Sequence, residues 1–207
     1  MFIRILRGPV ADEAGARAEL ERWRGELGRA AGWQRLTAGV AEGELVALFR
    51  YDDEAAAIAG AGKGEQTGWQ AAVERHLTGP AAWHDCQVVH VMKAGDAEPA
   101  GFVRVVQGRL ADPVRLAGMR AEVERTLRER APHILGVVVA EHADEPDGFT
   151  EVTYCTSERD TRAFERQLPV EMAVQLGTVR SYVEGLRTLE LRDPLLAQPF
   201  EPAVPVA

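Results

Sequence analysis

An internal repeat constrains the fold of this chain more than any other feature of its sequence. The segment FIRILRG at positions 2–8, followed by Asp12, returns as FVRVVQG at 102–108, followed by Asp112. A second pair of segments, RAELER at 17–22 and RAEVER at 120–125, also matches. Similarity over this length indicates that each half of the chain forms one folding unit, built on the same plan.

Length and composition agree with two small domains. The chain has 207 residues, of which 46% are hydrophobic and 27% charged, enough for two cores in domains of about 100 residues each. A net charge of −8 disfavours nucleic acid and anionic membranes as partners. No apolar stretch approaches the roughly 20 residues of a membrane span, and the chain opens on a predicted strand, so we expect a cytoplasmic protein.

Hydrophobic periodicity predicts the order strand, helix, strand, strand, helix, strand in each half. Asp12 is the expected N-cap of the first long helix. The first half contains strands at 2–7, 34–40, 45–51 and 87–92, and helices at 12–31, just after 52–53, and at 69–77. The second half contains strands at 102–107, 134–142, 148–156 and 178–191, and helices at 112–130 and 157–167 with a further turn at 170–175.

These elements predict an α+β fold of two ferredoxin-like (βαββαβ) repeats. The first repeat covers 1–95 and the second covers 101–192, with a linker between them and an extended, proline-rich surface tail at 193–207. Each sheet carries its helices on one face, and its other face needs a cover. We expect the two sheets to pack against each other, which would give an intramolecular pseudo-dimeric α+β barrel.

The strand at 2–8, the helix after Asp12, the sequence RYDD at 50–53 and Trp69 with His76-Leu77 and Pro80 resemble the dimeric α+β barrel superfamily. The antibiotic-biosynthesis monooxygenase (ABM) domains are the most similar members. The resemblance implies a fused pair of domains and a pocket bordered by the helix that carries Trp69 and His76. The chain departs from that pattern in the glycine-containing insertion at 60–68, which we expect to be a lid or plain surface. The second repeat also lacks the Trp and the His.

Strand alternation allows side chains to be assigned to faces. We expect the β-branched face of Ile3 and Ile5 to lie under the helices, which turns Arg4 and Arg104 into the barrel. The same alternation would turn inward His90, Glu151, Arg180 and Tyr182. Buried arginines need partners. They could pair with Glu151 and Glu184, or lie in water at the mouth of the barrel. Alternatively, they could grip an anionic or phenolic ligand through their guanidinium forks.

The polar residues form no recognisable motif for binding a metal or a cofactor. The five histidines show no metal-ligand spacing, and the cysteines, Cys86 and Cys155, are expected to be free thiols. No glycine-rich dinucleotide motif follows a strand, and the first strand offers Arg4 where the related heme-degrading domains have Asn. We therefore expect no metal, heme, flavin or nicotinamide. His76 shares a helix face with Trp69 and could deprotonate a phenol. The alternative is a helix that packs Trp69 and Val73 as core, with His76 at its edge.

Two functions remain open at this stage. In the first, the chain is an ABM-like, cofactor-independent monooxygenase of an aromatic or polyketide-like substrate. His76 or His90 is then the base, Arg4 and Arg104 stabilise oxyanions, and Trp69 and Tyr182 contact the substrate, with Glu151 and Arg180 beside it. In the second, the chain is a non-catalytic ligand-binding or stress-response barrel. Either would be a monomer with an internal pseudo-twofold axis, or would self-associate further, with a small molecule as partner.

Overall fold

The computed structural model describes residues 1–27, 33–61, 64–92 and 99–197, and it has the predicted α+β composition. The first half contains β1 (Phe2–Pro9), α1 (Glu13–Leu27), β2 (Trp33–Ala41), β3 (Glu44–Tyr51), α2 (Glu54–Ala61), α3 (Gly64–Glu74) and β4 (Ala82–Met92). The second half contains β5 (Phe102–Leu110), α4 (Pro113–Arg130), β6 (Ile134–His142), β7 (Gly148–Cys155), α5 (Glu158–Arg166), α6 (Val170–Arg180), β8 (Val183–Arg192) and β9 (Leu195–Ala197). The repeated βαββαβ order is confirmed.

Equivalent helices of the two halves begin in the same way. The carboxylate of Asp12 accepts the backbone N–H of Gly15 at 3.0 Å, and that of Asp112 accepts the backbone N–H of Arg115, also at 3.0 Å. Pro113 occupies the first turn of α4, where its missing N–H costs no hydrogen bond. The duplicated aspartates are therefore N-caps that fix where each long helix starts.

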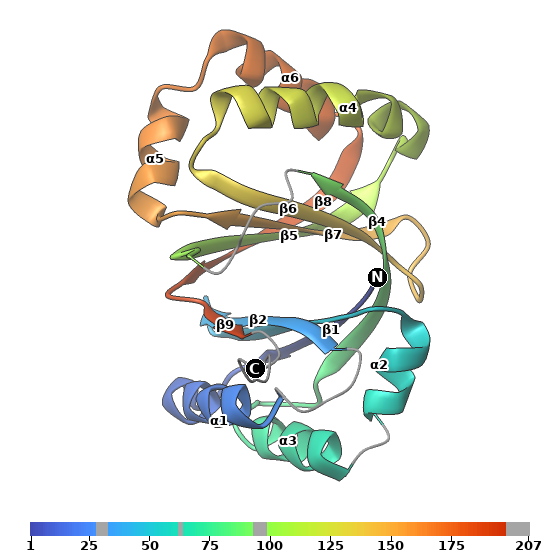
Figure 1. Cartoon of the computed structure of the whole chain (residues 1–207), viewed down its shortest axis with the longest axis vertical. Coiled ribbons are helices and arrows are strands. Elements are labelled where there is room, and N and C mark those ends of the chain that lie inside the picture. The colour runs from blue at the N-terminus through green and yellow to red at the C-terminus, as the bar shows by residue number, and fades with distance from the viewer. Residues whose placement is uncertain (28–32, 62–63, 93–98, 198–207) are drawn as a thin grey trace, which may run out of the picture. The chain divides into compact units, whose positions relative to one another are not determined.

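The chain divides into two compact units. The N-terminal unit comprises Met1–Trp83 together with the chain from Leu195 onward, and the C-terminal unit comprises His84–Pro194. The N-terminal unit has an antiparallel sheet in the order β1-β3-β2-β9, and the C-terminal unit has one in the order β4-β6-β7-β5-β8. Helices α4, α5 and α6 lie on one side of the second sheet (Figure 1).

The compact units do not coincide with the sequence repeats, because each unit contains a strand from the other half. From Cys86 onward, β4 of the first half pairs with β6. The tail, which we expected to be extended surface, returns as β9 and pairs Leu195 with Ala38 of β2. Leu195 and Ala197 are buried, with 5% and 6% exposure. Strand exchange therefore links the two sheets through the covalent chain.

The expected faces of β1 and β5 are reversed. Phe2 and Leu6 belong to a buried cluster with Ala16 and Leu20 of α1 and with Val73 of α3. Because side chains alternate along a strand, Arg4 shares this helix-covered face. Ile3 and Ile5 lie on the opposite face. β-Branched residues favour a strand because they fit its pleated surface, and both faces of a strand are pleated. Their presence therefore does not indicate which face the helices cover. The large side chains here fill the space beneath the helices.

The C-terminal unit shows the same reversal. Arg104 forms an ion pair with Glu165 of α5, so its face of β5 is the helix-covered one. Thr153 is directly opposite Arg104 and Glu151 is opposite Val106, which places Glu151 on that face too. The opposite face, which carries Val103 and Val105, is also almost completely buried.

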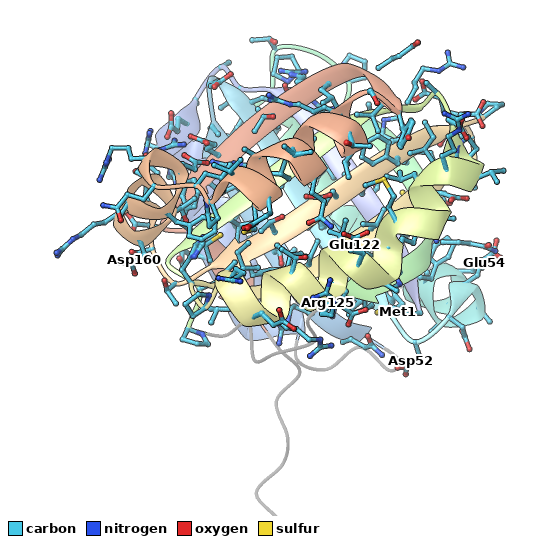
Figure 2. The ribbon with its side chains drawn as sticks, turned by 90° about the horizontal axis from the view of Figure 1, so that it is seen from above. Met1, Asp52, Glu54, Glu122, Arg125 and Asp160 are labelled. Atoms are coloured by element: carbon cyan, nitrogen blue, oxygen red, sulfur yellow. The ribbon has the colours of Figure 1, made fainter. Side chains whose placement is uncertain are left out.

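The glycine-containing stretch at 60–68 is helical in its described part, with Gly60 in α2 and Gly64 and Gly68 in α3. Its role as a lid or as plain surface stays a prediction. Two expectations for the strand predicted at 178–191 are wrong. Arg180, expected on a strand, is the last residue of α6 and is exposed. Tyr182 lies in the turn that follows it. On α4, Glu122 and Arg125 are exposed (Figure 2). None of the helices in the described ranges is both long and apolar enough to cross a bilayer.

Candidate functional site

His76, the first predicted base, is held against the start of α1. It follows α3, and its backbone carbonyl accepts the N–H groups of Ala11 and Asp12 at 2.8 and 3.2 Å. Its Nδ1 lies 3.0 Å from the Oδ2 atom of Asp12. The two residues are 64 positions apart in the sequence. The fold thus pairs an imidazole with a carboxylate that the sequence indicates only as a helix cap.

The geometry sets the role of each ring nitrogen. Backbone donation from Gly15, and then the His76 side chain, hold the pKa of Asp12 below its ordinary value. An ionised carboxylate can only accept, so we assign a proton to Nδ1 of His76. In a neutral ring with that tautomer, Nε2 carries the lone pair. The His76 side chain is 23% exposed. An imidazole that is oriented through one ring nitrogen and can accept a proton at the other is the usual arrangement of a general base.

The second repeat shows that this imidazole is not required by the fold. There Tyr182 takes the place of His76, and its carbonyl accepts the N–H groups of Ala111 and Asp112 at 2.8 and 3.3 Å. The two turns have the same hydrogen bonds, and Asp112 caps its helix without an imidazole. Tyr182 was predicted to contact the substrate. Its backbone carbonyl forms the same hydrogen bonds in the second repeat that the carbonyl of His76 forms in the first.

The two predicted oxyanion-binding arginines have different surroundings. The Arg4 guanidinium carbon lies 5.2 Å from the centre of the Trp83 ring, a cation–π distance. Arg104 donates from Nη2 to Glu165 at 2.6 Å and to Glu190 at 3.0 Å. The expected ion pairing of Arg104 is thus present, but with other partners than Glu184. Since Arg4 and Arg104 both lie on helix-covered faces, the prediction that they point away from the helices is wrong.

Arg104 belongs to an ionic network between α5, β5 and β8, which we call the α5 network. Besides Arg104, it contains Arg162, Arg192, Glu158, Glu165 and Glu190. Arg162 donates to Glu165 at 3.1 Å and also to Glu190. Opposite charges are equal in number among these six groups. The network therefore leaves little free positive charge to attract an anionic ligand.

The pKa values of the α5 network reflect this mutual neutralisation. Burial by itself lowers the pKa of Arg104, but hydrogen bonds to Glu165 and Glu190 outweigh burial and raise it above its ordinary value. Burial likewise raises the pKa of Glu190, and hydrogen bonds from Arg162 and Arg104 bring it below its ordinary value. Glu151 behaves differently, because its burial raises its pKa despite a hydrogen bond from Thr153 and the nearby Arg104 charge.

His90, the second predicted base, faces the helices and not the opposite side. Its Nε2 atom lies 3.7 Å from a carboxylate oxygen of Glu124 on α4. The cause is a bulge in β4, since Val88 pairs with Ala140 while His90 pairs with the adjacent Val139. One extra residue turns the following side chains to the other face. The predicted inward orientation of His90 is therefore wrong.

Two further sequence-predicted residues, Trp69 and Arg180, lie in different units. Trp69 lies in α3, and its side chain is outside the described residues, so its contact with a substrate stays a prediction. Arg180 is exposed at the end of α6 in the C-terminal unit. Sequence reasoning missed a different group, formed by His84, His142 and Asp144. Only the pairing of β4 with β6 brings the two histidines together, and no sequence spacing signals it.

The sequence matches no protein-family model and no curated protein. A "putative monooxygenase" from Fusobacterium nucleatum subsp. nucleatum has a similar structure, with a TM-score of 0.77 and 11% identity over 95% of this chain and 94% of that one. An "anthrone oxidase-like protein" matches with a TM-score of 0.68 and 13% identity over 100% and 97% of the two chains.

A third solved structure connects the fold to the resemblance seen in the sequence. A ferredoxin-fold protein from Listeria monocytogenes 4b F2365, described as related to antibiotic biosynthesis monooxygenases, matches with a TM-score of 0.54 and 10% identity, over 94% of this chain and 95% of that one. Identities this low show the fold and nothing finer. The chain thus has, over nearly its whole length, the tandem ferredoxin-like fold of ABM-like proteins.

Proposed function

We propose that this protein is a cofactor-independent monooxygenase of an aromatic, polyketide-like substrate, with His76 as its general base. The proposal rests on one observation, the 3.0 Å contact between Nδ1 of His76 and the Asp12 carboxylate. A carboxylate that orients the imidazole also stabilises the imidazolium formed when Nε2 takes a proton. The second repeat builds the same turn without an imidazole, so the turn needs only the backbone of His76, and we assign its side chain to chemistry.

The reaction is balanced with dioxygen as the sole oxidant. Nε2 of His76 removes a proton from an acidic C–H or O–H group of the substrate, which leaves a delocalised aromatic anion. The anion transfers electrons to dioxygen and forms a carbon–oxygen bond, giving a hydroperoxide once a proton returns. Loss of water then gives a ketone or quinone, so that one oxygen atom enters the product and the other leaves as water.

Two further observations support this class of substrate. Solved proteins of the same fold are named a "putative monooxygenase" and an "anthrone oxidase-like protein". Anthrones carry a C–H group acidified by two aromatic rings and a carbonyl, which suits a histidine base. Arg104 of the second repeat forms ion pairs with Glu165 and Glu190. We therefore assign the chemistry to the first repeat, which carries His76, and a structural role to the second repeat.

Oxygen uptake by the full chain with anthrone and a panel of hydroquinones tests the proposal. We expect His76→Ala to lower kcat by about 10²-fold or more, the usual contribution of a general base. Asp12→Asn should lower kcat less, because it removes only the orienting charge. His133→Ala is the matched control, since His133 packs on Phe164 in the C-terminal unit and should leave uptake unchanged.

Gly15→Ala provides a test that keeps both partners in the chain. A Cβ atom at position 15 would lie 2.2 Å from Oδ2 of Asp12 and 2.3 Å from the His76 ring, so the pair must separate. We expect uptake to fall while circular dichroism stays native. Full activity of His76→Ala would overturn the proposal. Binding of the panel without oxygen uptake by the unmodified chain would instead support the non-catalytic binding barrel.

A further inference from the structure

The C-terminal unit gathers two histidines and a carboxylate at one end of its sheet. Cys86 of β4 is paired with His142 of β6, and His84 lies two residues before Cys86 on the same face. The imidazole rings of His84 and His142 are stacked, with centroids 4.8 Å apart and an interplanar angle of 19°. Asp144 follows His142 in the turn between β6 and β7 and accepts from Nδ1 of His84 at 3.1 Å.

The ligand atoms of these three residues lie close together. One atom from each of His84, His142 and Asp144 lies within 4.8 Å of the other two. Glu145, the next residue of the turn, places Oε2 at 3.6 Å from Nδ1 of His142. Ligands of a tetrahedral zinc ion lie about 3.4 Å apart, given metal–ligand bonds near 2.1 Å. Small side-chain rotations therefore suffice to close the group around an ion.

His142 has an unused nitrogen that points into this group. Its side chain is only 4% exposed, and its Nδ1 atom has no hydrogen-bond partner among the described residues. The opposite nitrogen, Nε2, lies 2.8 Å from the hydroxyl of Thr150, which in turn accepts from Gln107 at 2.9 Å. Metal-binding histidines are typically oriented in this way, by a partner on the nitrogen that does not face the metal.

Gly148 keeps the space in front of that nitrogen open. A Cβ atom at this position would lie 2.9 Å from Nδ1 of His142 and 3.0 Å from the carbonyl oxygen of Glu145. The backbone of Gly148 is not left-handed, so the conformation itself does not call for glycine. What glycine provides here is room beside a buried nitrogen.

We propose that His84, His142, Asp144 and Glu145 bind one divalent transition-metal ion, with Zn²⁺ as the best fit. Two imidazoles and two carboxylates match the ligand preference of zinc, and the two negative charges balance the ion. The side chains of Asp144 and Glu145 are 50% and 46% exposed, so an ion can enter from solvent. For Nδ1 of His84 to bind the ion, the proton on that nitrogen must pass to Nε2 of the same ring or to solvent.

Titration of the untagged full chain with Zn²⁺ and Co²⁺ tests this site without any substrate or dioxygen. Calorimetry should show one ion per chain, and Co²⁺ should develop the intense visible absorption of a tetrahedral complex. His84→Ala and His142→Ala should each weaken binding by about 100-fold or more. His133→Ala, which removes a histidine of the same unit outside the group, should bind as the unmodified chain does.

Two milder variants keep the test decisive if a histidine variant fails to fold. Gly148→Ala fills the space before Nδ1 without changing any ligand, and Thr150→Val removes the partner that orients the ring. Both should weaken Co²⁺ binding by about 10-fold or more. The proposal is overturned if the unmodified chain shows no saturable binding at micromolar Zn²⁺, or if all variants bind equally. Neither result bears on His76, which lies in the other unit.

Discussion

At the scale of single residues, Cys86 shows how position decides chemistry. The side chain is fully buried, and its thiol lies 3.8 Å from the carbonyl oxygen of His84. Burial raises the pKa of this thiol to about 12, and the carboxylates of Asp144 and Asp85 add to the rise. A thiol that cannot ionise is a poor nucleophile.

We predict that Cys86 in the folded chain resists a disulfide reagent at pH 8. A rise in pKa from 9.0 to about 12 lowers the thiolate fraction about 10³-fold. The measurement uses the Cys155→Ser variant, in which Cys86 is the remaining cysteine. The same variant in denaturant serves as the control and should react at the ordinary rate. A rapid reaction of the native variant would contradict the assigned burial.

Individual contacts were the part of the site least accessible to sequence reasoning. Both Asp12 and His76 stand out in the sequence, one as a cap and the other as a base. Their contact depends on how α3 returns to the start of α1, which no local pattern encodes. The sequence analysis named neither Glu165 nor Glu190, because glutamates on solvent-exposed elements are common. Only the fold shows that both pair with Arg104.

At the scale of elements, the α5 network joins one helix to two strands. Glu190 of β8 binds Arg104 of β5 and Arg162 of α5, and its side chain is 22% exposed. Removing its charge leaves two arginines close together with one glutamate fewer. Such a change is costly in partly buried surroundings, because the remaining charges stay desolvated without full compensation.

We predict that Glu190→Gln lowers the free energy of unfolding by about 1–2 kcal/mol at pH 7. The folded pKa of Glu190 lies below its ordinary value of 4.5. Its contribution is therefore complete above about pH 4.5 and is lost as the pH falls through the folded value. Urea unfolding at pH 7 and pH 3.5 should show a difference between variant and parent that shrinks in acid. Glu184→Gln, an exposed position of the same strand, should match the parent at both values.

Element order was predictable, whereas the orientation of the strands was not. Period-two and period-3.6 patterns gave the repeated βαββαβ order, and the duplicated aspartates gave the helix starts. Each face of β1 carries one arginine among apolar side chains, Arg4 on one face and Arg7 on the other, so the pattern contains no sign of which face the helices cover. His90 was misplaced for another reason, because a bulge in β4 leaves no mark in the hydrophobic alternation.

At the scale of the whole molecule, strand exchange makes each unit depend on distant sequence. Leu195 of β9 is paired with Ala38 of β2, and Ala197 is paired with Leu36. Leu195 and Ala197 belong to the same buried cluster as Ala16 and Leu20 of α1 and Val73 of α3. Sequence periodicity identifies a strand but does not say which copy of a duplicated sheet it joins, so this exchange could not be predicted.

We predict that Leu195→Ala destabilises the protein by about 2–4 kcal/mol, the usual cost of a cavity in a core. Hydrogen exchange should also accelerate at the β2 amides near Ala38, more than 150 positions away in the sequence. Leu196→Ala is the matched control, because Leu196 is only half-buried, and it should cost less. Equal effects of the two substitutions on urea unfolding would argue against the assigned packing of β9.

The return of β9 also governs how the nascent polypeptide can mature on the ribosome. Translation delivers β1, β2 and β3 early, but the strand that completes the edge of β2 is made only after both repeats have been synthesised. Until then, β2 presents an open edge, which is the kind of surface that recruits other chains into aggregates. Chains that stall before Leu195 are therefore expected to aggregate, and they should bind chaperones more than chains in which β9 has formed.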